Sequence, residues 1–316
     1  MDTDILIYSG LFIASLAVLL KASDWFIDSA EEIGLSLGIS PYIIGVTIIA
    51  FGTSLPELAT SVASVISGNS EIVIGNVVGS NITNIALVLG MVAIYVKDIK
   101  LESDIWKLDM PFLWFTAFFL WFIVRDQHVS YMEACLLLIS LVVFLALSFG
   151  ADDDDDGEEK PKASAKSYIL LLVGAILVSV GANYTVVAIE QLSSKAGIDP
   201  SVIALSAVAL GTSLPEVIVS LNAARKGKTS IAIGNVLGSN IFNTLAVVGI
   251  PTFFGSLEIP SDVLAFSLPL MIVMTILFGI MCFSRNISRW EGFILIIFYL
   301  YFLVELFSSI VPSSSS

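Results

Sequence analysis

The chain has 316 residues, of which 57% are hydrophobic and 13% are charged, and its mean hydropathy is +0.95. Soluble domains carry about 25% charged residues, so this composition excludes a soluble globular protein and predicts an integral membrane protein. The formal net charge is −14, with 28 acidic and 14 basic residues. This balance disfavours a nucleic-acid partner and leaves the lipid bilayer as the expected surroundings.

Ten apolar runs, each about long enough to cross a bilayer as a helix, follow one another along the chain. They cover residues 5–29, 41–67, 72–95, 109–124, 131–149, 168–193, 199–223, 231–252, 262–283 and 290–309. The runs are continuously apolar rather than alternating, which favours helices over a membrane barrel. No basic region precedes the first run, so we interpret it as a membrane helix and not as a cleaved signal peptide.

One hexapeptide, Gly-Thr-Ser-Leu-Pro-Glu, occurs twice, ending at Glu57 and at Glu216, which are 159 residues apart. The same offset relates Pro41 to Pro200 without any gap. We therefore predict two repeats of five helices each, over 1–149 and 168–311, joined by an acidic linker at 150–167 and followed by a disordered tail at 312–316.

The basic residues indicate an orientation. With ten spans, one side of the membrane receives eleven of the 14 basic residues, which are Lys97, Lys100, Lys107, Lys160, Lys162, Lys166, Arg225, Lys226, Lys228, Arg285 and Arg289. By the positive-inside rule this side is cytoplasmic, so both termini are expected outside the cell. Since each repeat has an odd number of spans, the two would enter the membrane in opposite senses, as in inverted-repeat transporters.

The duplicated hexapeptide predicts a cation site. A proline inside a helix frees the carbonyl four residues earlier, so Pro56 acts on Gly52 and Pro215 on Gly211. Freed carbonyl oxygens need partners in the membrane, and a carboxylate follows each proline. Acidic side chains within a membrane segment are costly and are functional candidates by default. The neighbouring hydroxyl groups are hard oxygen donors too, and they belong to Thr53, Ser54, Thr212 and Ser213.

A second duplicated motif, Gly-Asn-x-x-Gly-Ser-Asn, begins at Gly75 and at Gly234. In each copy polar residues recur every fourth position and therefore share one helix face; they are Asn76, Ser80, Asn84, Asn235, Ser239 and Asn243. Calcium takes about six to eight oxygen ligands, whereas a transition metal favours imidazole or thiolate. The oxygen inventory therefore suits calcium and sodium. Small polar residues also mediate helix packing in membranes, and that reading stays open for each single serine or asparagine.

The remaining candidates are weaker. Asp152–Asp156 and the following glutamates make the linker a solvated, disordered cytoplasmic loop, with a weak calcium site as the alternative. Cys135 and Cys282 are expected to be buried free thiols, and His128 lacks partners for a metal site. Lys21 is expected beside Asp24, one turn along the first helix. We expect no catalytic residue and no cofactor, because the candidate site offers no obvious base or nucleophile.

At these motifs the chain resembles the calcium/cation antiporter superfamily, and within it the prokaryotic type of sodium/calcium exchanger, over nearly its whole length. The resemblance implies ten helices in two inverted five-helix repeats. It implies calcium ligation by Glu57 and Glu216 beside the backbone of Thr53 and Thr212. Sodium sites would use Ser54, Ser80, Ser213 and Ser239 with the carbonyls of Ala50 and Ala209, and Asn84 would face Asn243 near the centre.

Two departures bear on the coupling ion. Many sodium/calcium exchangers have aspartate where this chain has Asn243, which leaves two carboxylates in the site. Proton-coupled relatives typically carry a glutamate in the second motif, where this chain has Gly79 and Gly238. We therefore expect a secondary antiporter of the cell membrane that exchanges Na⁺ for Ca²⁺ without an obligatory protein partner. A proton-coupled or potassium-dependent calcium exchanger is the alternative, and a passive cation channel is a further one.

Overall fold

The computed structural model describes residues 3–101, 105–150, 162–196 and 211–310. Most of these residues are helical, and two short antiparallel ribbons are the other regular structure among them. Eight helical stretches are long and apolar enough to cross a membrane, and Asp109–Val124 is a shorter apolar helix. This agrees with the predicted helical membrane protein. The first part of the expected span 199–223, residues 199–210, lies outside the described residues.

The helices of the first half begin with α1 (Thr3–Ser36), which is longer than the predicted 5–29. The second predicted span is broken into α2 (Pro41–Ile44), the π-helix η1 (Gly45–Ile49), α3 (Ala50–Thr53) and α4 (Leu55–Ile66). The third consists of α5 (Glu71–Ile82), the π-helix η2 (Thr83–Leu89) and α6 (Gly90–Val96). Then follow α7 (Asp109–Val124) and α8 (Tyr131–Gly150).

The second half starts with the long α9 (Ala165–Lys195) and continues, after a gap, with α11 (Leu214–Arg225). The next span is α12 (Thr229–Phe242), η3 (Asn243–Val247) and α13 (Val248–Thr252). It is followed by η4 (Val263–Ser267) with α14 (Leu268–Cys282), and by α15 (Arg289–Ile310). The four ribbon strands are β1 (Asp98–Lys100), β2 (His128–Val129), β3 (Leu257–Glu258) and β4 (Asn286–Ser288).

The two ribbons obey the offset of 159 found in the sequence. In one ribbon Ile99 pairs with Ile287, and in the other His128 pairs with Glu258. Adding 159 to 99 gives 258, and subtracting it from 287 gives 128, so the two pairs are each other's counterparts. The internal duplication therefore extends from the sequence to the pairing of loops that join different halves.

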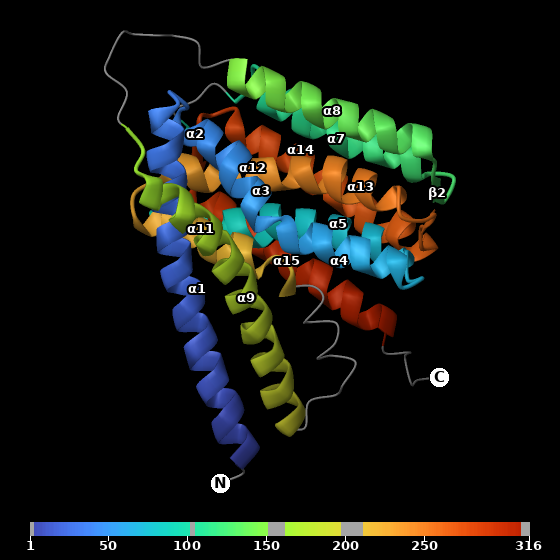
Figure 1. Ribbon diagram of the computed structural model, residues 1–316. Helices are drawn as coiled ribbons and strands as arrows, with labels where there is room; N and C mark the ends of the chain where they lie inside the picture. The colour runs from blue at the N-terminus through green and yellow to red at the C-terminus, as the bar shows by residue number, and fades with distance from the viewer. Residues whose placement is uncertain (1–2, 102–104, 151–161, 197–210, 311–316) are drawn as a thin grey trace.

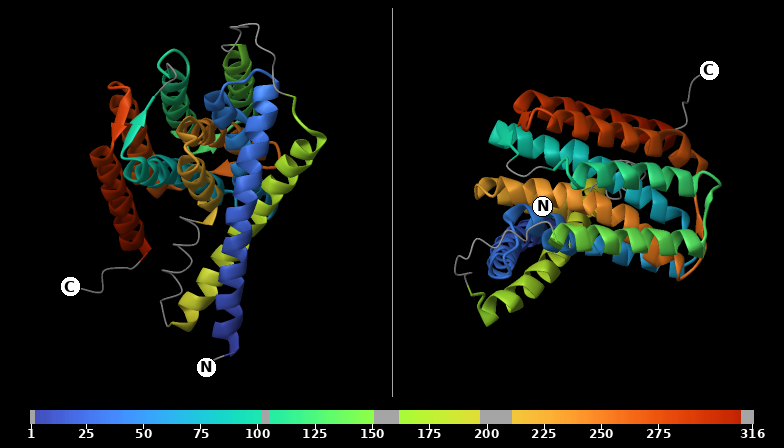
Figure 2. Two further views of the ribbon diagram at one scale, coloured as in Figure 1. Left: turned by 90° about the vertical axis from the view of Figure 1, so that its left-hand side faces the viewer. Right: turned by 90° about the horizontal axis from the view of Figure 1, so that it is seen from above.

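Two groups of helices differ in direction. Most run roughly side by side and form a bundle, whereas α1 and α9 lie together and cross it steeply (Figures 1 and 2). The core helix α12 is buried from Ile231 to Phe242. It approaches the second span closely, because Gly234 and Gly238 lie where a Cβ would overlap the backbone of residues 42–46.

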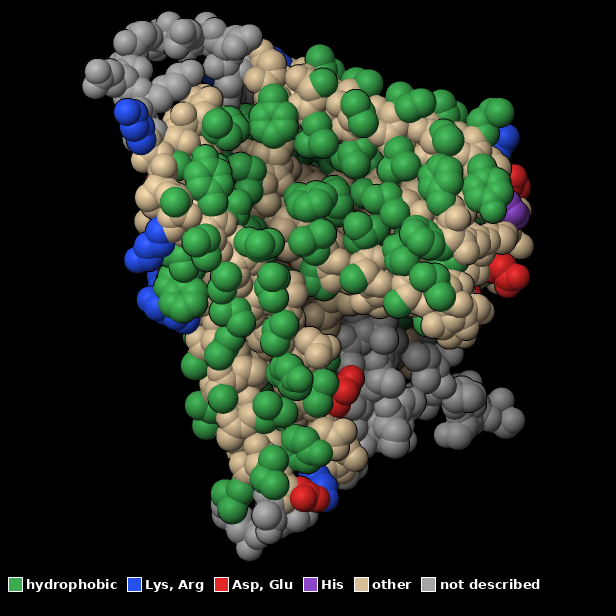
Figure 3. Space-filling view, in the orientation of Figure 1, with side chains coloured by type: hydrophobic (Ala, Val, Ile, Leu, Met, Phe, Trp, Pro, Cys, Tyr) green, Lys and Arg blue, Asp and Glu red, His purple; other side chains and the backbone are tan. Residues whose placement is uncertain are grey.

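The outer surface is apolar over a broad face, while lysine and arginine side chains gather at one edge and acidic side chains with the histidine at the opposite edge (Figure 3). One smaller expectation was wrong: Cys282 is buried as predicted, but Cys135 is exposed on α8. Lys21 is near enough to Asp24 for a charge interaction, as expected, and also lies over the ring of Trp25. The direct ion-pair partner of Asp24 is Lys226 in the other half.

Candidate functional site

The hexapeptides form two interruptions at which a helix begins again. At Ser54 the backbone angles are φ −88° and ψ 5°, and at Ser213 they are φ −86° and ψ 2°, so both residues lie outside helix geometry. The new helices α4 and α11 each carry proline and then glutamate in their first turn. A helix N-terminus favours a negative charge. Glu57 and Glu216 are fully buried at these two N-termini, as the predicted site requires.

Two asparagines of the second motif hold the threonines of the first motif, each across the two halves. The Thr53 hydroxyl donates to Asn235 Oδ1 at 3.1 Å, and the Thr212 hydroxyl donates to Asn76 Oδ1 at 3.1 Å. Both bonds are related by the offset of 159. These contacts across the halves hold both threonine side chains beside the two carboxylates.

The same asparagines also hold the helices that carry the glutamates. Asn76 Nδ2 donates to Ser61 at 3.2 Å, and Asn235 Nδ2 donates to Ser220 at 2.9 Å. Ser61 and Ser220 each lie one helical turn beyond a glutamate. The sequence placed both asparagines on the polar helix face but indicated no role for them, and the two serines were not among the predicted site residues. The offset of 159 between Ser61 and Ser220 was the signal that could have identified these serines.

The hydroxyl groups assigned to the site lie in the same network. Ser80 and Thr212 hydroxyls are 3.3 Å apart, and those of Ser239 and Thr53 are 3.4 Å apart. Ser54 donates to Glu216 Oε1 at 3.1 Å. Residues from both halves, distant in sequence, thus converge on one buried polar cluster.

The symmetry fails at one pair. Neither oxygen of Glu57 has a hydrogen bond of standard geometry within the described part of the chain, although the Thr212 side chain lies near enough to interact with it, and the Ser213 hydroxyl has no partner there either. The second glutamate lies near enough to Glu57 for charge repulsion between them. Buried carboxylates are stable only when paired, neutralised or bound to a cation, so this cluster has the properties of a cation site.

The central asparagines coincide with π-helical turns. Asn84 lies in η2 and Asn243 begins η3, and both are fully buried. No hydrogen bond joins them. Asn84 Nδ2 donates instead to Asn240 Oδ1 at 3.5 Å, and both amide atoms of Asn243 lack a partner among the described residues. Isolated π-helical turns occur frequently at functional sites.

The donor set determines which cations fit. In the described residues, no three His, Cys, Asp or Glu side chains come together to hold a metal. Among the unpartnered buried oxygens are carboxylate, hydroxyl and amide oxygens of Glu57, Glu216, Ser213, Asn84 and Asn243. Calcium and sodium prefer such hard oxygens at flexible geometry. The Ala50 carbonyl accepts from Ser54 N at 3.1 Å and from Thr53 Oγ1 at 3.3 Å, and Ala209 lies outside the described residues.

A cavity of about 360 Å³ reaches the cluster from the side of α9. Its wall includes Asn76 and Thr212 at the polar cluster, Pro56 and Pro215 at the helix breaks, and Glu190 on α9. The volume is sufficient for hydrated small ions, and the cavity reaches Asn76 and Thr212, whereas Glu57 and Glu216 are themselves fully buried.

Comparison with known proteins places these features in a family context. The family model for the sodium/calcium exchanger protein matches residues 7–150 and 166–307. The sodium/calcium exchanger MaX1 of Methanosarcina acetivorans is 33% identical, over 94% of this chain and 97% of its own. Human sodium/potassium/calcium exchanger 2 is 34% identical over 41% of this chain and 20% of its own.

The fold has a solved counterpart as well. A structure of the sodium-calcium exchanger NCX_Mj soaked with 2.5 mM Na⁺ and 10 mM Sr²⁺ superposes with a TM-score of 0.84 at 30% identity. The match covers 95% of this chain and 99% of that chain.

Proposed function

The chain belongs to the sodium/calcium exchanger family, and from this premise we propose that it is a secondary antiporter that exchanges Na⁺ for Ca²⁺ across the cell membrane. The observation that carries the proposal is the pair of buried carboxylates, Glu57 and Glu216, at two helix N-termini within one oxygen-rich cluster. The inward Na⁺ gradient would drive Ca²⁺ out of the cell.

Exchange follows from charge neutralisation. Two carboxylates in a low-dielectric interior repel each other strongly when no cation is bound. One Ca²⁺ or two Na⁺ would balance them, so the two ions compete for the same oxygens. The conformational change that exposes the site to the other side of the membrane is then accessible when cations are bound and disfavoured when they are absent.

The ligand roles follow the resemblance residue by residue. Glu57 and Glu216, with the carbonyls of Thr53 and Thr212, would bind Ca²⁺. Na⁺ would use Ser54, Ser80, Ser213 and Ser239 with the Ala50 and Ala209 carbonyls, and Asn84 and Asn243 would contribute amide oxygens. Support comes from the hydrogen bonds of Thr53 and Thr212 to asparagines of the other half, which hold both residues beside the two carboxylates.

The architecture that we propose is two inverted five-helix repeats, over 1–149 and 168–311, with the site between them and both termini outside. The common offset of the two ribbons and of the asparagine bonds supports the duplication. Basic side chains gathered at one edge of the bundle (Figure 3) support a cytoplasmic placement of that edge and of the linker at 150–167.

The direct test is uptake of ⁴⁵Ca²⁺ into proteoliposomes loaded with Na⁺. We expect uptake that requires an outward Na⁺ gradient and that stops when Na⁺ outside equals Na⁺ inside. Uptake driven only by a proton gradient would overturn the sodium assignment. Uptake that needs no ion on the opposite side would indicate a channel rather than an antiporter.

Potassium is a second candidate for coupling, because the chain resembles part of the sodium/potassium/calcium exchangers. Asn243 in place of an acidic residue disfavours it, since the site then has only two carboxylates to balance extra cations. Replacing K⁺ by choline on both sides of the membrane should therefore leave Na⁺-driven Ca²⁺ uptake unchanged.

A further inference from the structure

Helices α1 and α9 are fastened to each other near both ends. Lys195 Nζ on α9 lies 2.7 Å from Asp4 on α1, and at the other end the Ser164 amide donates to Glu32 at 2.8 Å. Between these ends the helices approach closely at two glycines of α9, Gly174 and Gly181. The pair is therefore one unit that crosses the bundle (Figure 1).

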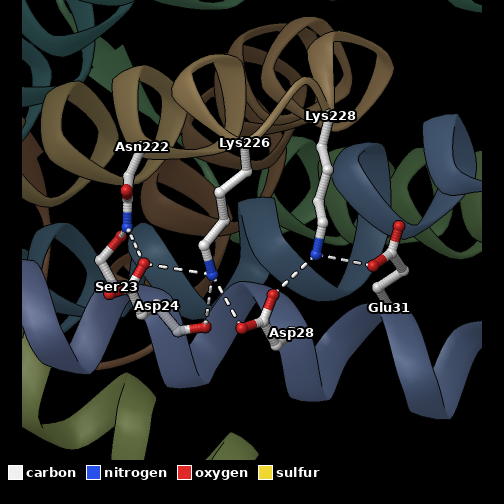
Figure 4. Close-up of polar contacts among 7 residues, drawn as sticks. All are labelled: Ser23, Asp24, Asp28, Glu31, Asn222, Lys226 and Lys228. Carbon is white, nitrogen blue, oxygen red and sulfur yellow. Dashed lines mark hydrogen bonds and ion pairs between the residues drawn. The ribbon is translucent and has the colours of Figure 1, made fainter.

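A charged network fastens this unit to the bundle at the basic edge. Lys226 lies 3.1 Å from Asp24 and 2.7 Å from Asp28, and Lys228 lies 2.7 Å from both Asp28 and Glu31. The acids are on successive turns of α1, and the lysines are in the turn between α11 and α12 (Figure 4). Because Asp28 is shared by both lysines, the four contacts form one connected network.

Lys228 is well placed to remain charged. Burial by itself lowers the pKa of Lys228, but the hydrogen bonds to Asp28 and Glu31 outweigh it, so the pKa lies above the usual value of a lysine. Beside the network is a polar hollow of about 360 Å³ whose wall includes Glu31, Lys228 and Lys100. Water and salt can therefore reach its rim, which screens the ion pairs in part.

The buried polar cluster around the two glutamates is covered differently on its two sides. On the α1 side the ring of Phe26 fills the space beside Gly52, so a Cβ there would overlap the ring. On the α9 side the methyl groups of Val186 would be 3.5 Å from a Cβ on Gly211, and the cavity at the cluster runs past both residues. The polar cluster is therefore closed by Phe26 on the α1 side, whereas a cavity reaches it on the α9 side.

The counterpart positions cannot form the same network. Subtracting 159 from the lysine positions, and adding 159 to the aspartate positions, gives uncharged residues at Ser67, Asn69, Asn183 and Val187. Four ion pairs therefore close one end of the unit, and the duplicated chain has no equivalent pairs at the other end. The two ends of the unit therefore differ in their charged residues, although the fold around them is duplicated.

We propose that the network of Asp24, Asp28, Glu31, Lys226 and Lys228 is a lock that biases the exchanger towards the conformation open at the α9 side. The inference rests on the proposed alternating access, in which the α1 and α9 unit moves over the bundle. To open the site on the side of the network, the α1 and α9 unit must move away from Lys226 and Lys228. The ion pairs must therefore break in each transport cycle.

The test compares the half-saturating Ca²⁺ concentration at the two faces, measured as Na⁺-driven ⁴⁵Ca²⁺ uptake in membrane vesicles of each orientation. Apparent affinity at a face scales with the population open to it. In the double variant Lys226→Met, Lys228→Met, we expect the ratio of the network-face to opposite-face concentrations to fall roughly tenfold, as four weak ion pairs are lost. Asp28→Asn should shift the ratio in the same direction and add little to the double variant, because it removes shared contacts.

The matched control is Lys195→Met, which removes an ion pair of the same length within the moving unit. It should leave the ratio unchanged. An equal loss of maximal rate in all variants without a change of the ratio would mean that the network only supports the fold, and it would overturn the lock. Replacing part of the buffer by choline chloride should shift the wild-type ratio towards that of the lysine variant, because salt screens the pairs.

Hydrogen exchange separates failure of the lock from failure of the proposed function. Absence of Na⁺-driven uptake in the wild type would overturn the exchange function alone. The lock still predicts faster amide exchange at residues 50–57 in the lysine double variant but not in Lys195→Met, because Phe26 withdraws from Gly52. Faster exchange confined to residues 222–230 would contradict the lock and show a local effect.

Discussion

Ser54 donates its hydroxyl to Glu216 across the two halves at 3.1 Å, whereas Ser213, its counterpart 159 residues later, has no hydrogen-bond partner among the described residues. Ser54→Ala should therefore leave a buried carboxylate oxygen without its donor and lower the free energy of unfolding by about 1–3 kcal/mol. Ser213→Ala removes an unpartnered hydroxyl and should change it by less. Thermal unfolding in Na⁺-free and Ca²⁺-free buffer measures both. Equal losses would show that the asymmetry does not exist in solution.

Neutralising either glutamate should abolish Ca²⁺ transport. At an effective dielectric constant of 20, two unit charges 4 Å apart interact by about 4 kcal/mol, so Glu57→Gln or Glu216→Gln should weaken Ca²⁺ binding by about a hundredfold or more. Uptake of ⁴⁵Ca²⁺ in proteoliposomes is the measurement. Glu71→Gln, at an exposed acid on α5, is the matched control and should transport normally. Retained flux in either buried variant would remove these carboxylates from the mechanism.

Adding a third acid at the centre should alter the coupling ions. Asn243 is fully buried without partners for its amide, so Asn243→Asp introduces a carboxylate of nearly the same shape beside the other two. We expect a steeper dependence of Ca²⁺ uptake on Na⁺ concentration, because an extra charge must be balanced. The Hill coefficient for Na⁺ checks this, with protein yield and melting temperature as controls for folding. An unchanged coefficient would place residue 243 outside the ion site.

The asparagine bridge should matter for transport as well as for stability. Asn235→Ala removes the acceptor of Thr53 and the donor to Ser220 together, whereas Ser220→Ala removes only the second contact. We expect Asn235→Ala to raise the half-saturating Ca²⁺ concentration by roughly tenfold, at about 1.4 kcal/mol for a lost hydrogen bond, and Ser220→Ala to raise it less. If both variants changed only the melting temperature, the bridge would have no part in ion binding.

The acidic linker should be dispensable for basal exchange. Asp152–Glu159 lie between the two proposed repeats and contribute none of the proposed ligands. Deleting them should leave the maximal rate of Na⁺-driven uptake within about twofold of wild type, because long flexible loops are tolerated well. A correctly inserted deletion variant without transport would assign the linker an essential role.

The sequence predicted the spans and the polar motifs well, because both depend on local pattern. Apolar length predicts a membrane helix, and Pro56 and Pro215 predict the breaks that the structure places at Ser54 and Ser213. The C-terminal end of α1 was less predictable, since the predicted span stops at residue 29 and the helix continues to Ser36. Glu31 in this added stretch is paired with Lys228 from the other half.

Contacts between residues distant in the sequence could not be predicted, because no local pattern contains them. The bond of Asn235 to Thr53 joins positions 182 residues apart, and the ion pair of Asp24 with Lys226 depends on how α1 crosses α11. The exposure of Cys135 on α8 is of the same kind, because an apolar helix has no sequence mark for its lipid-facing side.

The crossed asparagine bonds also constrain how this duplicated chain can evolve. Thr53 depends on residue 235 and Thr212 on residue 76. A substitution at one of these positions therefore requires a compensating substitution at its hydrogen-bond partner in the other half. The two halves are therefore bound to diverge together. In related chains, positions 53 and 235 should covary, and so should positions 76 and 212, which would leave a record of the interface that outlasts the resemblance between the repeats.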